Sequence, residues 1–470
     1  MPQDLGDQSG ASVHLLNLDP LLATVGSAAH PQNGPSAADS LTGLTSATPV
    51  ASSRSSAPPL SAATLPATGN LDGVTGLPLA PAGGNPSTAM APVGSAAGAD
   101  DQLYIVFLDH PGPGNPPGLA ARVQQLLGGT SAQDLLEHLN GFTARLNTAQ
   151  AQGLQRAPGV RSIEADRLVT LVQPVEVATV RSSGSISAAG QSTPYGIGMV
   201  WGGTDYSGAN NSGKYALVLD TGVSQNTNDL NINTSLSRNF TSIKSSDWID
   251  YHGHGTHVSG TIAAINDGDG VVGVAAGANV ISVRVLDRNG SGQTSWIVNG
   301  INYAAGLAKT GALSTVAVSS LVANMSLGGG LNSSIDNAVR AAATADSNGR
   351  YLRFSLAAGN SGADVDNYSP ANTGDAPNIY TVSAVDQSKT MASWSNYDNI
   401  GDSIDDCDFS QPGVGIVSLG MTAGTLVSMS GTSMAAPHMA GVLLMGTPLA
   451  GPLSKPVIAV ASGDPFASLS

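Results

Sequence analysis

One carboxylate in the sequence ends a pattern typical of a buried strand. Asp220 closes the apolar run Tyr215-Ala-Leu-Val-Leu-Asp220 and is followed by the turn residues Thr221-Gly222. Sites in α/β proteins form outside the carboxyl ends of strands, so Asp220 stands where a functional carboxylate is expected. A structural turn explains the same pattern. An aspartic protease would need a second Asp-Thr-Gly or Asp-Ser-Gly segment, and the sequence contains none.

A cluster of histidines precedes a helical pattern. The segment His252-Gly-His254-Gly-Thr-His257-Val-Ser-Gly-Thr261 leads into Ile262-Ala-Ala-Ile265. Small residues around His254 leave its ring free to meet partners from other loops, as a general base requires. Three histidines at this spacing also resemble zinc ligands, and a purely structural role is the third interpretation. The glutamate of the metalloprotease helix motif is missing, which weighs against the metal.

A serine lies at the predicted start of another helix. The segment runs Ser430-Gly-Thr-Ser433-Met-Ala-Ala-Pro437-His-Met-Ala-Gly441. The positive end of a helix dipole favours a developing alkoxide, and we expect Pro437 in the first turn, where amide protons lack helical partners. An ordinary helix-capping serine would fit the segment taken alone. A hydroxyl nucleophile needs a base, and the base needs a carboxylate, so the three segments together predict a Ser433–His254–Asp220 triad.

The elements around these residues indicate an α/β protein. From about Gly190 onward, apolar strands alternate with helical patterns, which predicts a mostly parallel sheet with helices on both faces. Before it, the alternating patterns predict a small α+β domain over residues 101–172. Its expected strands and helices are strand 103–108, helix 119–127, strand 141–146, helix 148–156 and strand 160–164. Residues 1–100 are of low complexity and predicted to be disordered, and residues 173–189 form a polar, Ser-rich linker.

Composition excludes several classes of protein. Eighteen Lys and Arg stand against 33 Asp and Glu, a net charge of −15 that a nucleic-acid backbone would repel. Cys407 is the sole cysteine, so we expect an incidental thiol, no intramolecular disulfide and no cysteine-ligated zinc. No apolar stretch is long enough to span a bilayer. We therefore expect a soluble monomer. The N-terminus lacks the basic start of a secretory signal, so the sequence alone leaves export and a cytoplasmic location open.

From Gly190 to Gly446 the chain resembles the subtilisin-like serine proteases. All three signature segments are present, at Asp220-Thr-Gly, at His254-Gly-Thr-His-Val and at Gly431-Thr-Ser433-Met-Ala-Ala-Pro-His. The resemblance implies a serine endopeptidase in which Asp220, His254 and Ser433 form the triad and His257 is a buried structural residue. Leu356-Ala-Ala-Gly-Asn360-Ser-Gly matches the segment that supplies an oxyanion donor. The resemblance thus makes Asn360 that donor, together with the Ser433 amide.

The resemblance also implies a substrate cleft with two Gly-rich edges. Such edges leave backbone groups open, so that an extended peptide adds between them as a strand. The edge residues are Gly290, Ser291, Gly292, Ser326, Leu327 and Gly328. One side-chain pocket, lined by 357–362 and 366–370, is similar to that of the proteinase K branch. We expect it to prefer bulky apolar residues before the cut.

Residues 101–172 resemble the family's inhibitory pro-domain, of ferredoxin-like fold, in the segments Tyr104-Ile-Val-Phe, Leu139-Asn-Gly-Phe-Thr-Ala-Arg-Leu146 and Val160-Arg-Ser-Ile-Glu-Ala-Asp166. The resemblance implies a secreted zymogen that cuts itself within the linker and is held inactive by its own pro-domain.

A calcium site is implied by three further matches. Gly190-Gln191-Ser-Thr-Pro194 resembles the mature N-terminus of bacterial subtilisins, in which the second residue is a ligand, here Gln191. Asp229 follows Asp220 at the family's spacing for another ligand, and the loop 265–271 falls on the calcium loop. Its ligands would be the Asp267 side chain and the carbonyls of Ile265, Asp269 and Val271.

The sequence departs from the family after the serine helix. Prolines follow closely at 448, 452 and 456, which predicts an early helix end and a shortened C-terminus for the catalytic domain 190–470. This departure keeps an alternative open, a catalytically degenerate relative that binds peptides. A zinc hydrolase built on His252, His254 and His257 is the third hypothesis.

Overall fold

The computed structural model describes residues 101–110, 117–181, 190–202, 211–241, 244–399, 407–454 and 463–469. The prediction of disorder for residues 1–100 lies outside the described residues, as does the linker from 182 to 189. No helix in the described ranges is long and apolar enough to cross a membrane.

A large, mostly parallel sheet carries the C-terminal part of the chain. Its strands are β7 (Tyr215–Asp220), β8 (Asn231–Ile232), β9 (Arg238–Asn239), β10 (Asn279–Arg284), β12 (Leu321–Met325), β14 (Phe354–Ala357), β16 (Ile379–Val385), β17 (Phe409–Pro412), β20 (Leu449–Leu453) and β21 (Pro465–Ser468). They follow the order β20-β21-β17-β16-β14-β12-β7-β10-β8, with β9 also paired to β10. Every pair is parallel except β20–β21. The expected short C-terminal tail therefore adds two strands to the sheet.

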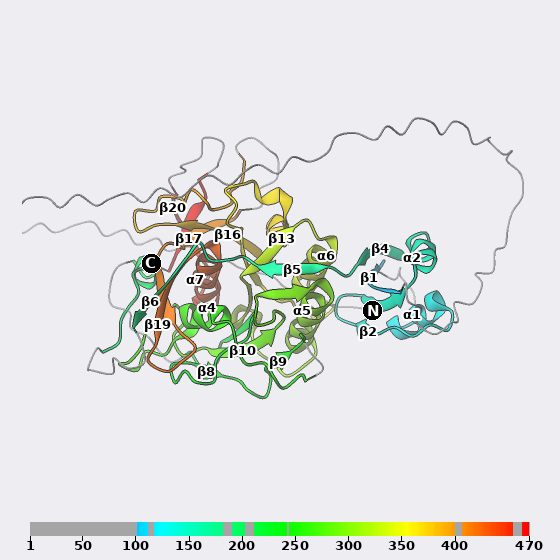
Figure 1. Cartoon of the computed structure of the whole chain (residues 1–470), viewed down its shortest axis with the longest axis horizontal. Coiled ribbons are helices and arrows are strands. Elements are labelled where there is room, and N and C mark those ends of the chain that lie inside the picture. The colour runs from blue at the N-terminus through cyan, green and yellow to red at the C-terminus, as the bar shows by residue number, and fades with distance from the viewer. Residues whose placement is uncertain are drawn as a thin grey trace, which may run out of the picture. The chain divides into compact units, whose positions relative to one another are not determined.

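Helices cover both faces of this sheet, which confirms the predicted α/β class. The helices are α3 (Tyr195–Val200), α4 (His254–Ala263), α5 (Thr294–Lys309), α6 (Ser333–Ala343) and α7 (Thr432–Met445), with 3₁₀ turns at η1 (Val318–Ser320), η2 (Val365–Asn367) and η3 (Ala371–Thr373). Successive strand residues face opposite sides. In β7, Ala216 and Val218 join the core under α4 and α7, whereas Leu217 and Leu219 join the core under α5 and α6. Figure 1 shows α4 and α7 as one pair of helices and α5 and α6 as another.

The preceding residues form the small α+β unit. It comprises β1 (Gln102–Leu108), α1 (Leu119–Leu127), β2 (Asp134–Leu136), β3 (Gly141–Leu146), α2 (Thr148–Gln155) and β4 (Val160–Ala165). Its sheet is antiparallel in the order β2-β3-β1-β4, the arrangement of a ferredoxin-like unit. The five elements expected from the sequence are present, and β2 is an addition.

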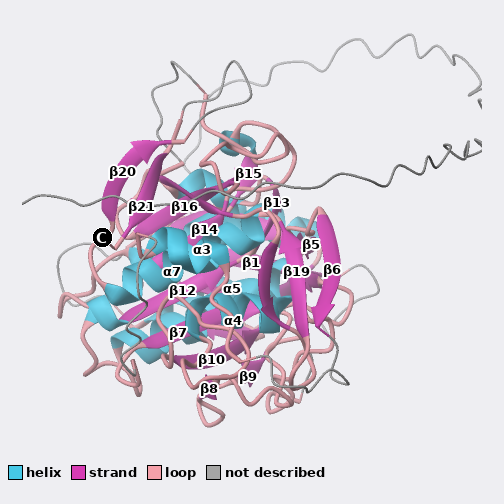
Figure 2. Cartoon of the chain, turned by 90° about the vertical axis from the view of Figure 1, so that its left-hand side faces the viewer, coloured by secondary structure: helices cyan, strands magenta, loops and turns pink. Residues whose placement is uncertain are grey.

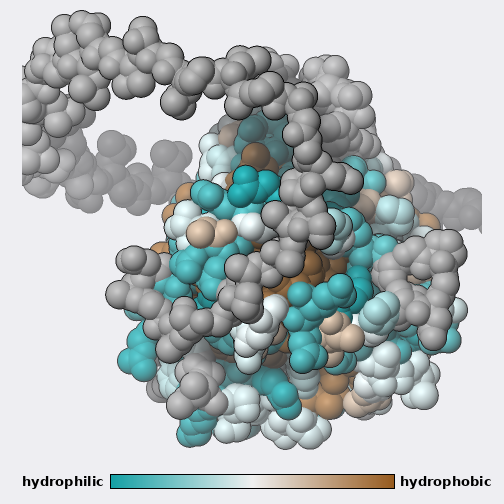
Figure 3. Space-filling model, turned by 90° about the vertical axis from the view of Figure 1, so that its right-hand side faces the viewer, coloured by the Kyte–Doolittle hydropathy of each residue, from teal (hydrophilic) through white to brown (hydrophobic). Residues whose placement is uncertain are grey.

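The sheet of the small unit is apolar on both faces. Val106 and Leu108 pack in the unit's own core, whereas Ile105 and Phe107 belong to the core that contains α5 and α6. Figure 3, seen from the side that carries this unit, shows hydrophobic residues among the hydrophilic ones on the described surface. Apolar atoms contribute a large part of the surface of any folded protein, so this mixture is expected.

Two further sheets join the small unit to the large sheet through residues 168–181. Their strands are β5 (Leu168–Leu171), β6 (Glu176–Arg181), β11 (Ser291–Gln293), β13 (Leu327–Gly330), β15 (Tyr368–Ser369), β18 (Ile416–Leu419) and β19 (Leu426–Ser430). One sheet has the order β11-β5-β13-β15 and the other β18-β19-β6. Figure 2 shows β19 and β6 side by side. The linker expected at 173–189 thus contains a strand, because β19 offers its backbone edge to residues 176–181.

Candidate active site

Asp220 and His254 lie in contact at the carboxyl end of β7. Nδ1 of His254 is 2.8 Å from Oδ1 and 3.0 Å from Oδ2 of Asp220, and both side chains are buried. An ionised carboxylate only accepts hydrogen bonds, so the Nδ1 atom carries the proton and donates it. The Nε2 atom of His254 has no hydrogen-bond partner among the described residues. It is the bare nitrogen that can take up a proton.

A glycine and a second carboxylate allow the two loops to meet. A Cβ atom on Gly255 would lie 2.2 Å from the Gly222 carbonyl oxygen, so only glycine fits at this point of α4. Asp250 is 4% exposed and accepts a hydrogen bond of 2.9 Å from the Thr221 hydroxyl, whose oxygen accepts from the Gly255 amide over 3.0 Å. Asp250 therefore ties the loop after Asp220 to the start of α4.

Ser433 is the second residue of α7, and Pro437 is the sixth. The prediction that Pro437 lies in the first turn is therefore wrong, since only the first four amide groups lack helical partners. Pro437 has no N–H, which leaves the Ser433 carbonyl four residues earlier without a helical donor. The Ser326 hydroxyl donates to that carbonyl over 2.9 Å, and this contact fixes the backbone of Ser433.

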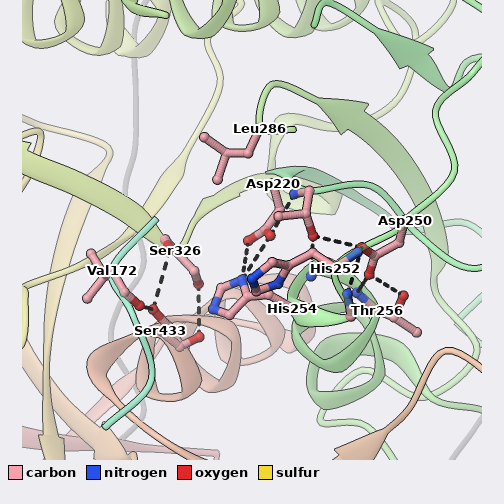
Figure 4. Close-up of polar contacts among 12 residues, drawn as sticks. Val172, Asp220, Asp250, His252, His254, Thr256, Leu286, Ser326 and Ser433 are labelled. Carbon is pink, nitrogen blue, oxygen red and sulfur yellow. Dashed lines mark hydrogen bonds and ion pairs between the residues drawn. The ribbon is translucent and has the colours of Figure 1, made fainter. Parts of the chain in front are cut away.

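The Ser433 hydroxyl faces a peptide group of the chain itself. Its Oγ atom donates to the Val172 carbonyl oxygen over 2.7 Å and lies 3.4 Å from the carbonyl oxygen of Ser326 (Figure 4). The hydroxyl has one proton, which is directed to Val172 and not to His254. Hydrogen bonds of a catalytic centre often form only when the substrate is bound in the reactive position.

The Asn360 side chain contacts the next carbonyl along the chain, that of Gln173. Its Nδ2 atom donates to the Gln173 carbonyl oxygen over 2.8 Å, while its Oδ1 atom accepts from the backbone amide and the hydroxyl of Thr432 over 2.9 Å each. Thr432 thereby fixes the amide so that Nδ2 faces the cleft. The contacts of Ser433 and Asn360 go to the successive carbonyls of Val172 and Gln173. Neither of these two carbonyl groups is therefore contacted by both Ser433 and Asn360.

Strand β5 fills the predicted cleft between two edges. The Leu171 amide donates to the Gly290 carbonyl over 2.8 Å, and Thr170 is opposite Ser291 on one side and Gly328 on the other. Both ladders are antiparallel. The six residues predicted to bind substrate all lie here, five along the two edges and Ser326 beside Ser433: Gly290, Ser291, Gly292, Ser326, Leu327 and Gly328.

A cavity of about 300 Å³ opens beside this segment. The first predicted pocket stretch lines it through residues 357–361, and the second contributes Tyr368 and Ser369. Residues 170–173 of the segment form another wall. The cavity therefore lies next to the carbonyls that Ser433 and Asn360 contact.

Comparisons with known proteins identify the family of this chain. The model of the subtilase family matches residues 213–446. The chain is 33% identical over 319 residues to subtilisin NAT of Bacillus subtilis subsp. natto, which covers 67% of this chain and 72% of that protein. The chain belongs to the subtilase family. It is a serine endopeptidase that acts on protein substrates.

The chain is also similar to two other proteins. The cuticle-degrading protease of Metarhizium anisopliae is 34% identical over 321 residues, again 67% of this chain and 72% of that protein. A crystal structure of a cold adapted subtilisin-like serine proteinase is 32% identical and covers 53% of this chain and 83% of its own, with a TM-score of 0.42.

Different contacts surround the three histidines at 252, 254 and 257. His257 is buried, with Nε2 3.0 Å from the carbonyl oxygens of both Ile416 and Val427, and burial lowers its pKa to about 3. The His252 ring lies edge-on to that of His254, with 6.3 Å between centroids. His254 uses its Nδ1 atom for Asp220. These contacts give no support to a zinc site.

An acidic cluster lies elsewhere in this subtilase. Among the described residues, Asp364, Asp366 and Asp398 are the group of acidic or metal-binding side chains whose ligand atoms lie within 4.8 Å of one another. Asp398 is buried and the other two side chains are partly exposed, and a group of carboxylates by itself assigns no metal.

The residues predicted to bind calcium come together. Asp229 accepts from the Ile265 amide over 3.0 Å and from the Val271 amide over 3.1 Å, and the Gln191 Nε2 atom donates to the carbonyls of the same two residues. Asp267 accepts from the Asp269 amide over 3.1 Å. Burial, and then the nearby charges of Asp267 and Asp269, raise the pKa of Asp229 to about 7. A cation bound here would favour the ionised carboxylate.

Sequence reasoning missed three residues of this site: Asp250, Thr432 and Val172. Asp250 precedes the histidine motif by two residues and Thr432 lies inside the serine motif, so their positions were visible but their partners were not. Val172 ends the predicted small domain, and no local pattern indicates that its carbonyl contacts Ser433.

Proposed function

We propose that Ser433 is the nucleophile, His254 the general base and Asp220 the carboxylate that orients it. The observation that carries this proposal is the buried contact between Asp220 and Nδ1 of His254, which leaves Nε2 bare while Ser433 holds a peptide carbonyl. Asn360 and the Ser433 amide are the oxyanion donors. The fixed orientation of the Asn360 amide supports this role.

The reaction follows from these positions. Oγ of Ser433 attacks the carbonyl carbon while Nε2 of His254 takes its proton, and Asp220 stabilises the imidazolium. Asn360 donates to the oxygen on which negative charge develops. Nε2 of His254 then gives the proton to the leaving amine. Water hydrolyses the acyl-enzyme, with His254 again as the base.

We further propose that residues 101–172 are an inhibitory pro-domain of a self-processing zymogen. Strand β5 filling the cleft supports this role. Two carboxylates of the small unit also meet helix starts, where negative charge is favourable. Asp166 accepts from the amide and hydroxyl of Ser295 in α5 over 2.8 Å each, and Glu164 accepts from the Ser334 amide in α6 over 2.9 Å. The first cut falls within or at the start of the linker 173–189, which frees the catalytic domain 190–470.

The cavity beside the cleft is the proposed pocket for the residue before the cut. Its walls at Ala357, Ala358 and Gly359 carry little side-chain bulk. A site with small apolar walls and a volume of about 300 Å³ favours bulky apolar side chains. Gly290, Gly292 and Gly328 pair with the substrate backbone on either side.

The loop 265–271, Asp229 and Gln191 form the proposed structural calcium site. The ligands would be the side chains of Gln191, Asp229 and Asp267 and the carbonyls of Ile265, Asp269 and Val271. Such oxygens are what a hard cation requires, and the ion would stabilise the fold without taking part in catalysis. A zymogen of this kind suits export, so we propose that the protein acts outside the cell.

A fluorophosphonate probe tests the catalytic assignment, because it reacts only with an activated serine hydroxyl. We expect the matured wild-type protein to bind one probe, located at Ser433 by peptide mass spectrometry. Ser433→Ala takes none, and His254→Ala reacts far more slowly. A matured protein that binds peptides but leaves the probe unreacted would be the degenerate peptide-binding relative.

A further inference from the structure

Residues 175–181 pair with the outer edge of β19. They follow directly after the segment that contacts Ser433. Strand β5 leads to Val172 and Gln173 at Ser433 and Asn360, and the Val175 amide then donates to the Ser430 carbonyl over 2.7 Å. From there β6 runs antiparallel to β19 along its whole length, with Glu176 opposite Ser430 and Thr179 opposite Val427. Figures 1 and 2 both show the two strands side by side.

Backbone pairing is the main attachment of β6. Val177 and Val180 are 61% and 56% exposed, although both are apolar. The Glu176 carboxylate adds a hydrogen bond of 3.2 Å from the Ser430 hydroxyl. A strand held chiefly through its main chain can be replaced by another extended segment of different sequence.

We propose that the edge formed by residues 426–429 of β19 binds the primed side of protein substrates, the residues C-terminal to the cut. The inference rests on the proposed role of Ser433. The occupant is an extended polypeptide that continues from the scissile bond, because a continuous chain already follows this path. The contact at Ser430 belongs to the cleft next to the serine, whereas the rest of β19 lengthens the substrate site by several residues.

The chain's own β6 competes for this edge after the first cut. A cut next to Val172 or Gln173 leaves residues 175–181 covalently attached to the catalytic domain, at high effective concentration. The edge becomes fully available to substrates only when that segment is removed. We therefore expect the full effect in mature enzyme whose N-terminus, determined by sequencing, lies at or near Gly190.

Peptides of increasing primed length test the proposal. All share the residues before the cut, enough to take the place of β5, and extend from about two to about eight residues beyond it. We expect kcat/KM to rise roughly 5- to 50-fold along the series, chiefly through KM, and then to level off past the end of β19. Control peptides carry the same extra residues at their N-terminal end and gain little.

N-methylation of single backbone amides distinguishes strand pairing from side-chain binding. In an antiparallel ladder every second amide faces the partner, so methylation should lower kcat/KM at alternate primed positions. Alanine substitution of the same side chains should change it less than about twofold. A flat length series, or losses that follow side chains and not alternate amides, would overturn the strand site.

The shortest peptide separates this proposal from the catalytic one. If it is hydrolysed and Ser433 takes up the fluorophosphonate, the catalytic assignment stands whatever the length series shows. If matured protein neither cleaves any peptide nor reacts with the probe, the proposed catalytic function fails and the strand proposal fails with it.

Discussion

Strands β5 and β6 belong to one continuous segment but are held in different ways. Strand β5 lies between two edges, β11 and β13, and its side chains Val169 and Leu171 are buried in the core shared with α5 and α6. Among the described strands, β6 pairs with β19 alone, and its valines are mostly exposed. In β5, burial of apolar side chains stabilises the docked strand in addition to its backbone hydrogen bonds. In β6, such burial contributes little.

The difference between the two strands suggests a division of tasks. An occupant of the β5 position is selected by its side chains, so that an inhibitory segment can bind there tightly. An occupant of the β6 position is accepted mainly for being extended. Ser433 lies between them, where it can separate a tightly held product from a loosely held one.

The largest expected effect is the complete loss of precursor cleavage when the Ser433 hydroxyl is removed. Ser433→Ala should abolish peptide hydrolysis and leave β5 and β6 joined in an uncut precursor, because the proposed self-processing needs the Ser433 hydroxyl as nucleophile. Denaturing electrophoresis and N-terminal sequencing would show the full-length chain, whereas wild type yields a new N-terminus between residues 171 and 190. A pure Ser433→Ala protein that still matures would contradict both the nucleophile and self-processing.

The next largest effect concerns Asn360, the proposed oxyanion donor at the junction of the two strands. Asn360→Ala should lower kcat by about 10²- to 10³-fold and leave KM nearly unchanged, since the donor acts on charge that exists only in the transition state. The steady-state kinetics of one peptide, measured on both proteins, decides it. Equal losses in kcat and in binding would assign Asn360 to substrate positioning.

Part of this arrangement could be predicted from local sequence. The apolar run ending in Asp220 predicts β7, and glycines beside the functional residues predict the turns at which loops approach one another. The alternation of strands and helices predicts the α/β class, which the structure confirms.

The remainder depends on partners far away in the chain. Residues 175–181 contain valines typical of a strand, but the local sequence predicts a linker there, because the edge that pairs with them lies about 250 residues later. Pro437 has its effect through Ser326, and Thr432 through Asn360. Local patterns do not encode such contacts, since they form only when the whole sheet is assembled.

A matched pair of substitutions sharpens the comparison between the two strands. Leu171→Ala should weaken inhibition by the released N-terminal fragment roughly 30-fold, because Leu171 is 2% exposed in the docked state. Val177→Ala, on the exposed face of β6, should leave the rate of first processing within about twofold of wild type. The inhibition constant of the purified fragment and the half-time of precursor cleavage are the two measurements. Similar small effects of both substitutions would mean that β5 is also held by its backbone alone.

The smallest expected effect is found beyond β6, at the loop 265–271. The backbone amide of Gln191 donates to the Gly268 carbonyl over 2.9 Å, so this loop fixes the start of the proposed catalytic domain. A calcium ion that binds the folded loop and not the unfolded chain stabilises by mass action. We expect excess chelator to lower the melting temperature of fluorophosphonate-inactivated mature enzyme by about 5 °C relative to millimolar calcium, with self-digestion of active enzyme becoming faster. Asp267→Ala should remove most of this dependence.

Asp386→Ala is the control, because Asp386 also accepts backbone amides in a turn but lies outside the loop. Its response to chelator should therefore stay intact. Equal melting temperatures with chelator and with calcium would exclude the site and leave the assignments of Ser433, His254 and Asp220 untouched.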